Sequence, residues 1–99
     1  MQSDRQGLLL SMQRALLGAI GRSVQAICVN WDENRVVMTA FIEGELPDDE
    51  REALEIAATE VAADFPFALL VEVVVFEHAA QPFRANGLWV FVRLGCTVV

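Results

Sequence analysis

The side chains that could carry out catalysis are few, and they do not form a recognised catalytic set. His78 is the only histidine, and Glu77 directly precedes it. If both lie in one strand, their side chains point to opposite faces, which is a poor geometry for an acid–base pair. Ser3, Ser11 and Ser23 fall within or beside helical segments and lack the Gly-x-Ser-x-Gly turn of a nucleophilic serine. These residues predict that the chain is not an enzyme.

The two cysteines give no sign of a redox or zinc site. Cys28 lies in an apolar strand pattern, where a free cysteine usually behaves as a small buried hydrophobe. Cys96 lies near the C-terminus, and neither cysteine has a Cys-x-x-Cys neighbour. Free thiols fit a reducing compartment. Because the N-terminal segment has the pattern of neither a signal peptide nor a membrane span, we expect a cytoplasmic protein that does not bind membranes.

Carboxylates are the most abundant reactive groups, and seven of the fourteen lie between Leu46 and Pro66. Clustered carboxylates can hold Ca²⁺ or Mg²⁺, but their spacing matches no EF-hand loop. The glycines are scattered and form no phosphate-binding loop. We therefore expect no metal and no cofactor. The carboxylates form either a solvated helix face or a surface for a basic partner.

The net charge of −7, without a single lysine, restricts the partners further. A nucleic-acid binder needs clustered cations to displace phosphate counterions, so direct binding to nucleic acid is not expected. Acidity keeps many small proteins soluble. It also steers association with a basic partner, because complementary fields raise the association rate. The sequence leaves both interpretations open.

The stretch from Leu46 to Pro66 is also the clearest helix of the chain. Its apolar residues recur at the spacing of a buried helical stripe, namely Leu54, Ala57, Ala58, Val61 and Phe65. Asp49 is the predicted N-cap, with Glu52 three residues later as in a capping box. The helix should end just before Pro66, which cannot donate a backbone hydrogen bond.

A first helix is predicted over residues 4–20. Its apolar residues share one face, namely Leu9, Met12, Leu16 and Ile20. Gly21 is the natural C-terminal stop. Further leucines make this apolar face wide, which fits a tertiary core, although a homodimer could also use it.

Four strands are predicted over residues 23–31, 35–43, 68–77 and 87–94, which are rich in β-branched and aromatic types. Asp32, Glu33 and Asn34 form the first turn, in which Asn34 is able to take a positive φ. The second strand is apolar on both faces, which indicates that part of the outer sheet face is covered. The connection over residues 78–86 is long for a hairpin, so it is either functional or a spacer.

These elements predict one α+β domain over residues 1–99, with frayed ends at residues 1–3 and 95–99. The order is α-β-β-α-β-β, which is two helix-plus-hairpin units in succession. The simplest fold is a two-layer sandwich, in which an antiparallel four-stranded sheet carries both helices on one face.

The predicted partner-binding surface is the outer face of the central helix. It comprises the carboxylates of that face and one isoleucine among them, namely Asp48, Asp49, Glu52, Glu55, Ile56 and Glu60. An exposed apolar side chain within an acidic rim suits the centre of a protein interface. Asp32 and Glu33, in the first hairpin turn, form a second candidate patch.

Several segments resemble a known group of proteins. They are VQAICVNWDENRV in the first hairpin, FIEGELPDDERE at the opening of the central helix, ATEVAADFP at its end and WVFVR in the last strand. Together, over residues 12–94, they are similar to the small acidic immunity proteins of bacterial contact-dependent growth inhibition and colicin-like toxin systems.

This resemblance implies a cytoplasmic protein that binds and neutralises a toxin domain, commonly a nuclease. The surface charge agrees, because an acidic protein can block the cationic cleft of a nuclease. The alternative is a homodimeric structural or interaction protein that has no toxin partner.

Overall fold

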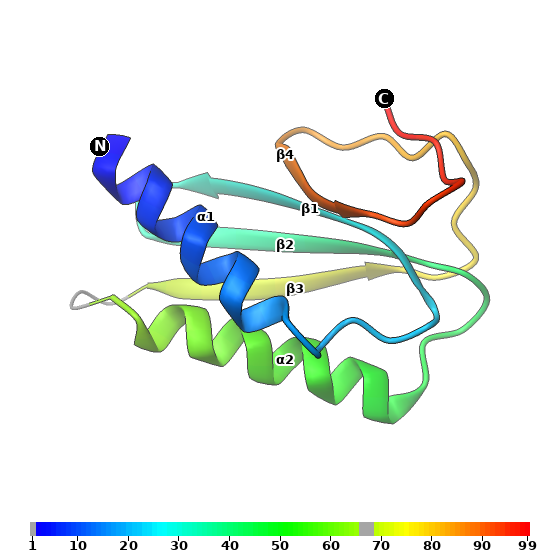
Figure 1. Ribbon diagram of the computed structural model, residues 1–99, viewed down its shortest axis with the longest axis horizontal. Helices are drawn as coiled ribbons and strands as arrows, with labels where there is room; N and C mark the ends of the chain where they lie inside the picture. Colours follow the sequence, from blue (N-terminus) through cyan, green and yellow to red (C-terminus); the bar gives the residue numbers. More distant parts are fainter. Residues whose placement is uncertain (1, 66–68) are drawn as a thin grey trace.

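The computed structural model describes residues 2–65 and 69–99, and Figure 1 shows how its elements are arranged. Helix α1 spans Gln2–Leu16 and is followed by strands β1 (Val24–Asp32) and β2 (Arg35–Ile42). Helix α2 spans Asp48–Ala63, and strands β3 (Leu70–Phe76) and β4 (Leu88–Val92) come last. Along the chain the elements follow the predicted order. The predicted start of the third strand, at residue 68, lies outside the described residues.

Helix α1 ends earlier than predicted. Its last residue is Leu16, and Gly18 takes a φ of 78°, a conformation that costs glycine little. The predicted stop at Gly21 was wrong, because Gly18 already ends the helix. Met12 of the predicted stripe is buried, and Leu8 is buried beside it. The centre of the buried face is therefore rotated slightly toward Leu8 from the predicted stripe.

Helix α2 begins without the predicted capping box. Pro47 is the N-cap, with φ −64° and ψ 152°, and makes no side-chain cap hydrogen bond, whereas the Asp49 carboxylate accepts a 3.0 Å hydrogen bond from the backbone N–H of Glu50 within the first turn. The helix therefore starts at Asp48, one residue before the predicted cap Asp49. The acidic first turn, which complements the helix dipole, is present. The predicted stripe is confirmed at its buried positions, namely Leu54, Ala57, Ala58 and Val61.

The four strands form one mixed sheet in the order β3-β2-β1-β4. β1 pairs antiparallel with β2 and with β4, whereas β2 and β3 are parallel. The prediction of an antiparallel sheet built from two hairpins was therefore wrong. The cause is α2: a helix between two strands carries the chain back to the end where the first strand began, so the two strands run parallel. As a result, β3 and β4 lie at opposite edges (Figure 1).

The main core lies between the sheet and the two helices, which pack on the same face (Figure 1). Its buried side chains come from both helices and from β1 and β2; Met12, Ile27, Met38 and Leu54 are each 0% exposed. Val71, Val73 and Val75 of β3 pack against the margin of this core. The predicted two-layer arrangement is therefore correct, although the pairing of its strands is not.

The opposite face of the sheet is covered over part of its area. A second cluster has four buried members, namely Ala26, Cys28, Phe41 and Phe83. Phe83 belongs to the β3–β4 connection, and its ring centroid lies 5.0 Å from that of Phe41. Backbone hydrogen bonds of 2.9 Å join Phe83 to Thr97 and to Val99. The predicted cover is confirmed, and residues 78–86 supply part of it.

Candidate partner-binding surface

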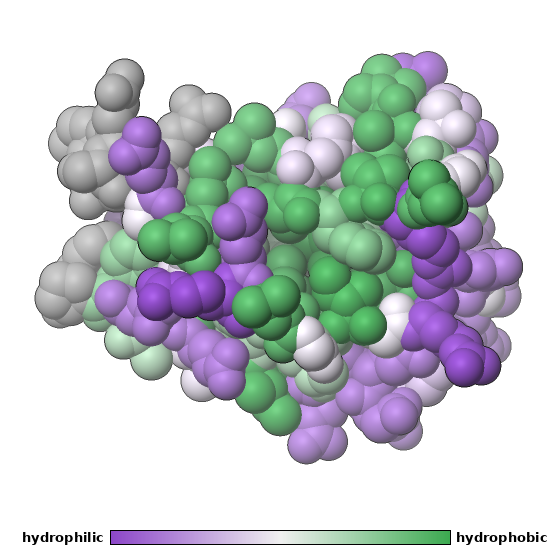
Figure 2. Space-filling model, in the orientation of Figure 1, coloured by the Kyte–Doolittle hydropathy of each residue, from purple (hydrophilic) through white to green (hydrophobic). Residues whose placement is uncertain are grey.

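The predicted binding face of α2 is accessible. The structure leaves every predicted residue of this helix exposed, namely Asp48, Asp49, Glu52, Glu55, Ile56 and Glu60. The Ile56 side chain is 51% exposed among these carboxylates. In Figure 2, the margin of the molecule along which α2 runs is mostly hydrophilic, with apolar residues between. An apolar side chain within a charged rim is a common arrangement at protein interfaces.

The carboxylates of α2 do not all face the same way. Glu60 lines a groove of about 340 Å³ together with Arg14 of α1, so Glu60 lies on the side of α2 that faces α1. Glu55 precedes it by five residues and is therefore rotated by about 140° round the helix. The predicted patch thus divides: Asp48 and Glu55 lie on the side away from α1, and Glu52, about 80° from Glu60, lies on the solvent-facing side of the helix between them. We call Asp48, Glu52 and Glu55 the outward carboxylates.

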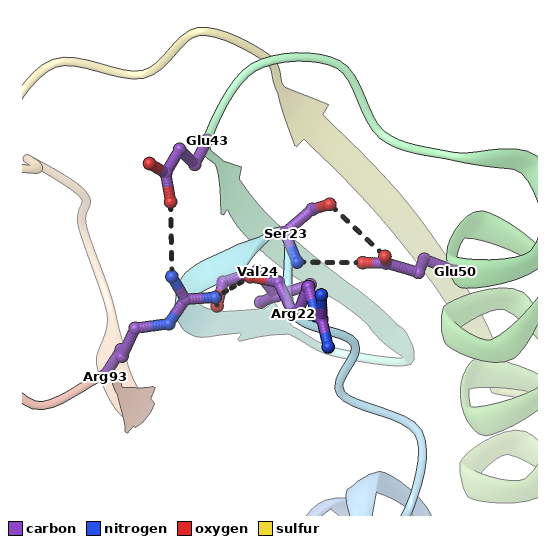
Figure 3. Close-up of polar contacts among 6 residues, drawn as sticks. All are labelled: Arg22, Ser23, Val24, Glu43, Glu50 and Arg93. Atoms are coloured by element: carbon purple, nitrogen blue, oxygen red, sulfur yellow. Dashed lines mark hydrogen bonds and ion pairs between the residues drawn. The ribbon is translucent and has the colours of Figure 1, made fainter.

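Glu50 points inward and has a structural role that the sequence analysis missed. Its carboxylate accepts hydrogen bonds from the backbone N–H of Ser23, at 3.0 Å, and from the Ser23 hydroxyl, at 3.2 Å (Figure 3). Gly21 passes so close that an added Cβ would lie 2.4 Å from the Glu50 carboxylate. Gly21 thus leaves room for the Glu50 carboxylate and does not end α1. Together these contacts tie the start of α2 to the segment that precedes β1.

A groove of about 780 Å³ opens beside this junction, and Arg93 and Glu43 are among its lining residues. Arg93 forms a 3.3 Å ion pair with Glu43. The Arg93 guanidinium also donates to the carbonyl oxygens of Arg22 and Val24 (Figure 3). These contacts hold the end of β4 against the start of β1. Because its paired charges bind each other, we interpret this groove as structural rather than as a ligand site.

The second predicted patch, Asp32 and Glu33, is exposed in the turn between β1 and β2. The backbone N–H of Leu70 donates a 2.9 Å hydrogen bond to the Asn34 carbonyl. This bond places the turn beside the start of β3, and thus near the end of α2 rather than its acidic first turn. Glu33 has the positive φ, 52°, because a two-residue hairpin turn needs it at the first position. Asn34, which could have taken a positive φ, does not do so in this turn.

The uncovered part of the outer sheet face carries exposed apolar side chains of β3. Leu70, Val74 and Phe76 are 58%, 36% and 52% exposed, and we call them the apolar strip. Glu72, between them, pairs with Arg35 of β2, and this hydrogen bond and charge raise the pKa of Arg35. The sequence predicted an apolar outer face but not which part of it stays open.

The residues considered for catalysis have other surroundings in the structure. Glu77 accepts a 2.7 Å hydrogen bond from the backbone N–H of Leu46, so its carboxylate holds the segment before α2. His78 is exposed, with a φ of 52°. Burial raises the pKa of the Cys28 thiol, which disfavours the reactive thiolate. Across residues 2–65 and 69–99, no group of three or more His, Cys, Asp or Glu side chains is placed to hold a metal ion.

An α+β domain that presents carboxylates beside exposed apolar side chains is suited to binding another protein. The chain belongs to the MafI2 immunity protein family, whose model matches residues 5–94. No curated protein is a significant match to the chain. Family membership confirms the resemblance to immunity proteins of toxin systems and implies a toxin protein as the partner; such families are generally non-enzymatic. No helix in the described part of the chain has both the length and the hydrophobicity of a membrane span.

Proposed function

We propose that this immunity protein neutralises a basic toxin domain by binding it through the outer face of α2. The observation that carries the proposal is the exposure of all the predicted carboxylates of α2, in a chain whose net charge is −7. Complementary charge raises the rate at which two proteins meet and fixes their orientation. The proposed contact residues are Asp48, Asp49, Glu52, Glu55, Ile56 and Glu60, with Asp32 and Glu33 as a separate second patch.

A nuclease domain is the proposed target class. Its nucleic-acid cleft must be cationic to bind phosphates, so an acidic helix can occupy or block that cleft. In this proposal the chain acts by binding and not by catalysis, without a metal, a cofactor or nucleic acid. Cys28 and Cys96 are free thiols, which fit a reducing compartment, so the proposed place of action is the cytoplasm.

Charge reversal on α2 tests the proposed surface. The variant Glu52→Lys/Glu55→Lys reverses two outward carboxylates about one helical turn apart. Immunity proteins are normally encoded next to their toxins, so the neighbouring gene is the source of the toxin domain for this test. The association rate of the variant with that toxin domain, measured by stopped flow at low salt, should fall at least about tenfold. The wild-type rate should also fall as salt is added, since salt screens exposed charges.

The matched control is Asp32→Lys/Glu33→Lys, which changes the net charge by the same amount at the other end of the sheet. We expect it to slow association much less than the α2 variant. An unchanged rate for the α2 variant would reject this face. Equal slowing by both variants would reject α2 as the main binding surface, because either the second patch contacts the toxin domain equally or net charge alone steers the encounter.

A homodimer is the second candidate function, and the apolar strip of β3 is the observation that favours it. Leu70 and Phe76 are both more than half exposed on the uncovered sheet face, although apolar surface of this kind is usually buried. Light scattering coupled to size exclusion, over a range of protein and salt concentrations, measures the mass. A constant mass of 10.9 kDa would reject the dimer.

A further inference from the structure

Among the strands of the described residues 2–65 and 69–99, β3 lies at an edge of the sheet, and none of them pairs with its outer side. Its described sheet neighbour is β2, in a parallel register that pairs Leu70 with Arg35 and Phe76 with Phe41. The N–H of Leu70 points toward β2, since it donates to the Asn34 carbonyl. Backbone groups alternate along a strand, so the N–H and C=O groups of Val71, Val73 and Val75 point outward.

The sequence of β3 lacks the residues that usually protect an edge strand. The sequence of β3, LVEVVVF, contains no proline and no lysine, and its one charged residue, Glu72, is paired with Arg35. An extended apolar edge of this kind readily accepts a further strand from another chain.

Helix α2 places negative charge beside the same edge. In the view of Figure 1, α2 runs along the outer side of β3. The hydrogen bond from Leu46 to Glu77 puts the start of α2 near the end of β3. The outward carboxylates occupy the first two turns of α2, on its solvent-facing side and its side away from α1, so they lie near the C-terminal half of the edge.

We propose that an extended, cationic segment of the toxin domain adds to β3 as a fifth strand of the sheet. This inference rests on the proposed function and specifies how the toxin domain is held. Main-chain hydrogen bonds to Val71, Val73 and Val75 supply the pairing, as in other cases of strand addition. Lysine or arginine side chains of the added strand face the outward carboxylates of α2.

The two faces of the sheet define the side chains of the added strand. Residues on the helix side lie next to the outward carboxylates, so they are basic. Residues on the other side lie next to the apolar strip of β3, so they are apolar. The expected toxin segment therefore has apolar residues at every second position along the seven residues of β3, and basic residues at the alternate positions opposite the C-terminal half of the strand.

A second copy of this chain fits the edge less well. Pairing β3 with β3 of another copy would bring two acidic α2 helices together, and like charges at that distance repel. A cationic segment instead neutralises these carboxylates. The charge around the edge therefore favours the toxin domain over a second copy.

Proline substitution tests the edge directly. Val73→Pro removes an outward N–H and leaves the bonds between β3 and β2 in place, because proline is tolerated where the N–H faces solvent. Val73→Ala is the matched control, since it shortens the same side chain and keeps the N–H. We expect Val73→Pro to weaken binding of the toxin domain encoded next to this chain by about tenfold or more, and Val73→Ala by less than about threefold.

Hydrogen exchange on the unmodified chain gives a second measurement that does not depend on a variant folding. In the free chain, the amides of Val71, Val73 and Val75 should exchange faster than those of Glu72, Val74 and Phe76. In the complex, the three outward amides should become protected. Selective protection together with the effect of Val73→Pro supports the inference.

The other outcomes overturn it in distinguishable ways. If the toxin domain binds while the outward amides exchange as in the free chain, the strand addition is wrong and the proposed function stands. If no toxin domain binds, both fail. If the outward amides are already protected in the isolated chain and become exposed on dilution, a second copy occupies the edge and the inference is wrong.

Discussion

Replacing Phe83 by alanine should destabilise the domain strongly, because this one ring anchors the cover of the outer sheet face. Phe83 is 1% exposed, and its ring stacks on that of Phe41 at a centroid distance of 5.0 Å. Truncating a buried phenylalanine costs about 3–5 kcal/mol, including the cavity that it leaves. The backbone bonds of Phe83 to Thr97 and Val99 remain in the variant. They allow some collapse of the segment, so we expect about 3–4 kcal/mol.

That loss is large compared with the total stability of a small domain, which is about 5–15 kcal/mol. For a chain of this size it corresponds to a fall in Tm of roughly 12–30 °C. Circular dichroism during thermal and urea unfolding measures both quantities. The same experiment shows whether unfolding stays cooperative or the cover is released first.

The matched control is Phe76→Ala, since Phe76 also stacks on Phe41, with its ring centroid 5.6 Å away. Phe76 is 52% exposed, so it removes far less surface from water, and we expect a cost below about 1.5 kcal/mol. The difference between the variants isolates burial from aromatic stacking. If Phe83→Ala costs no more than Phe76→Ala, Phe83 does not hold the cover on the sheet.

Two further predictions concern Glu50 and the thiols. Glu50→Ala leaves the Ser23 N–H without its acceptor, so we expect the free energy of unfolding, measured with urea, to fall by about 1–3 kcal/mol. The control Glu52→Ala, on the exposed face, should change it by no more than about 0.5 kcal/mol. Equal costs would contradict the structural role of Glu50. In the folded chain, Cys96 should be alkylated at least about tenfold faster than Cys28, because only the thiolate reacts and burial raises the pKa of Cys28. Mass spectrometry of the labelled peptides measures the two rates. The raised pKa also means that the stability contributed by neutral Cys28 is present below the ordinary thiol pKa and is lost as the pH rises through the higher pKa of the folded state. Equal labelling rates would show that Cys28 is accessible.

The helices and strands were predictable because each has its own repeat of apolar residues. The stripe through Leu54 and Val61 follows the period of a helix, and the β-branched runs follow that of strands. The pairing of strands carries no such repeat. A run such as LVEVVVF fits a parallel or an antiparallel neighbour equally well. The signal that could have decided it is the 16-residue helix α2 between β2 and β3, since a helix between strands favours a parallel pair.

The candidate site was predictable where it depends on charge alone. Exposed carboxylates of α2 could be found from the helical wheel, and the structure leaves them accessible. Glu50 was missed because it was counted with the acidic first turn. Its position four residues before the buried Leu54 puts both on one side of the helix, which was the available signal. The direction of Glu60 toward Arg14 depends on where α1 packs, which no local pattern of α2 reports.

The connection through α2 explains why an acidic helix and an open strand edge lie together. A helix that joins β2 to the parallel strand β3 must pack along that strand, so its free side lies beside the outer edge. The outward carboxylates on that side make pairing with a second copy unfavourable, because two such helices would repel each other. The same charges attract a basic strand. In the proposed strand addition, the charged helix beside the unpaired edge therefore favours a basic strand of the toxin domain over a second copy of the chain.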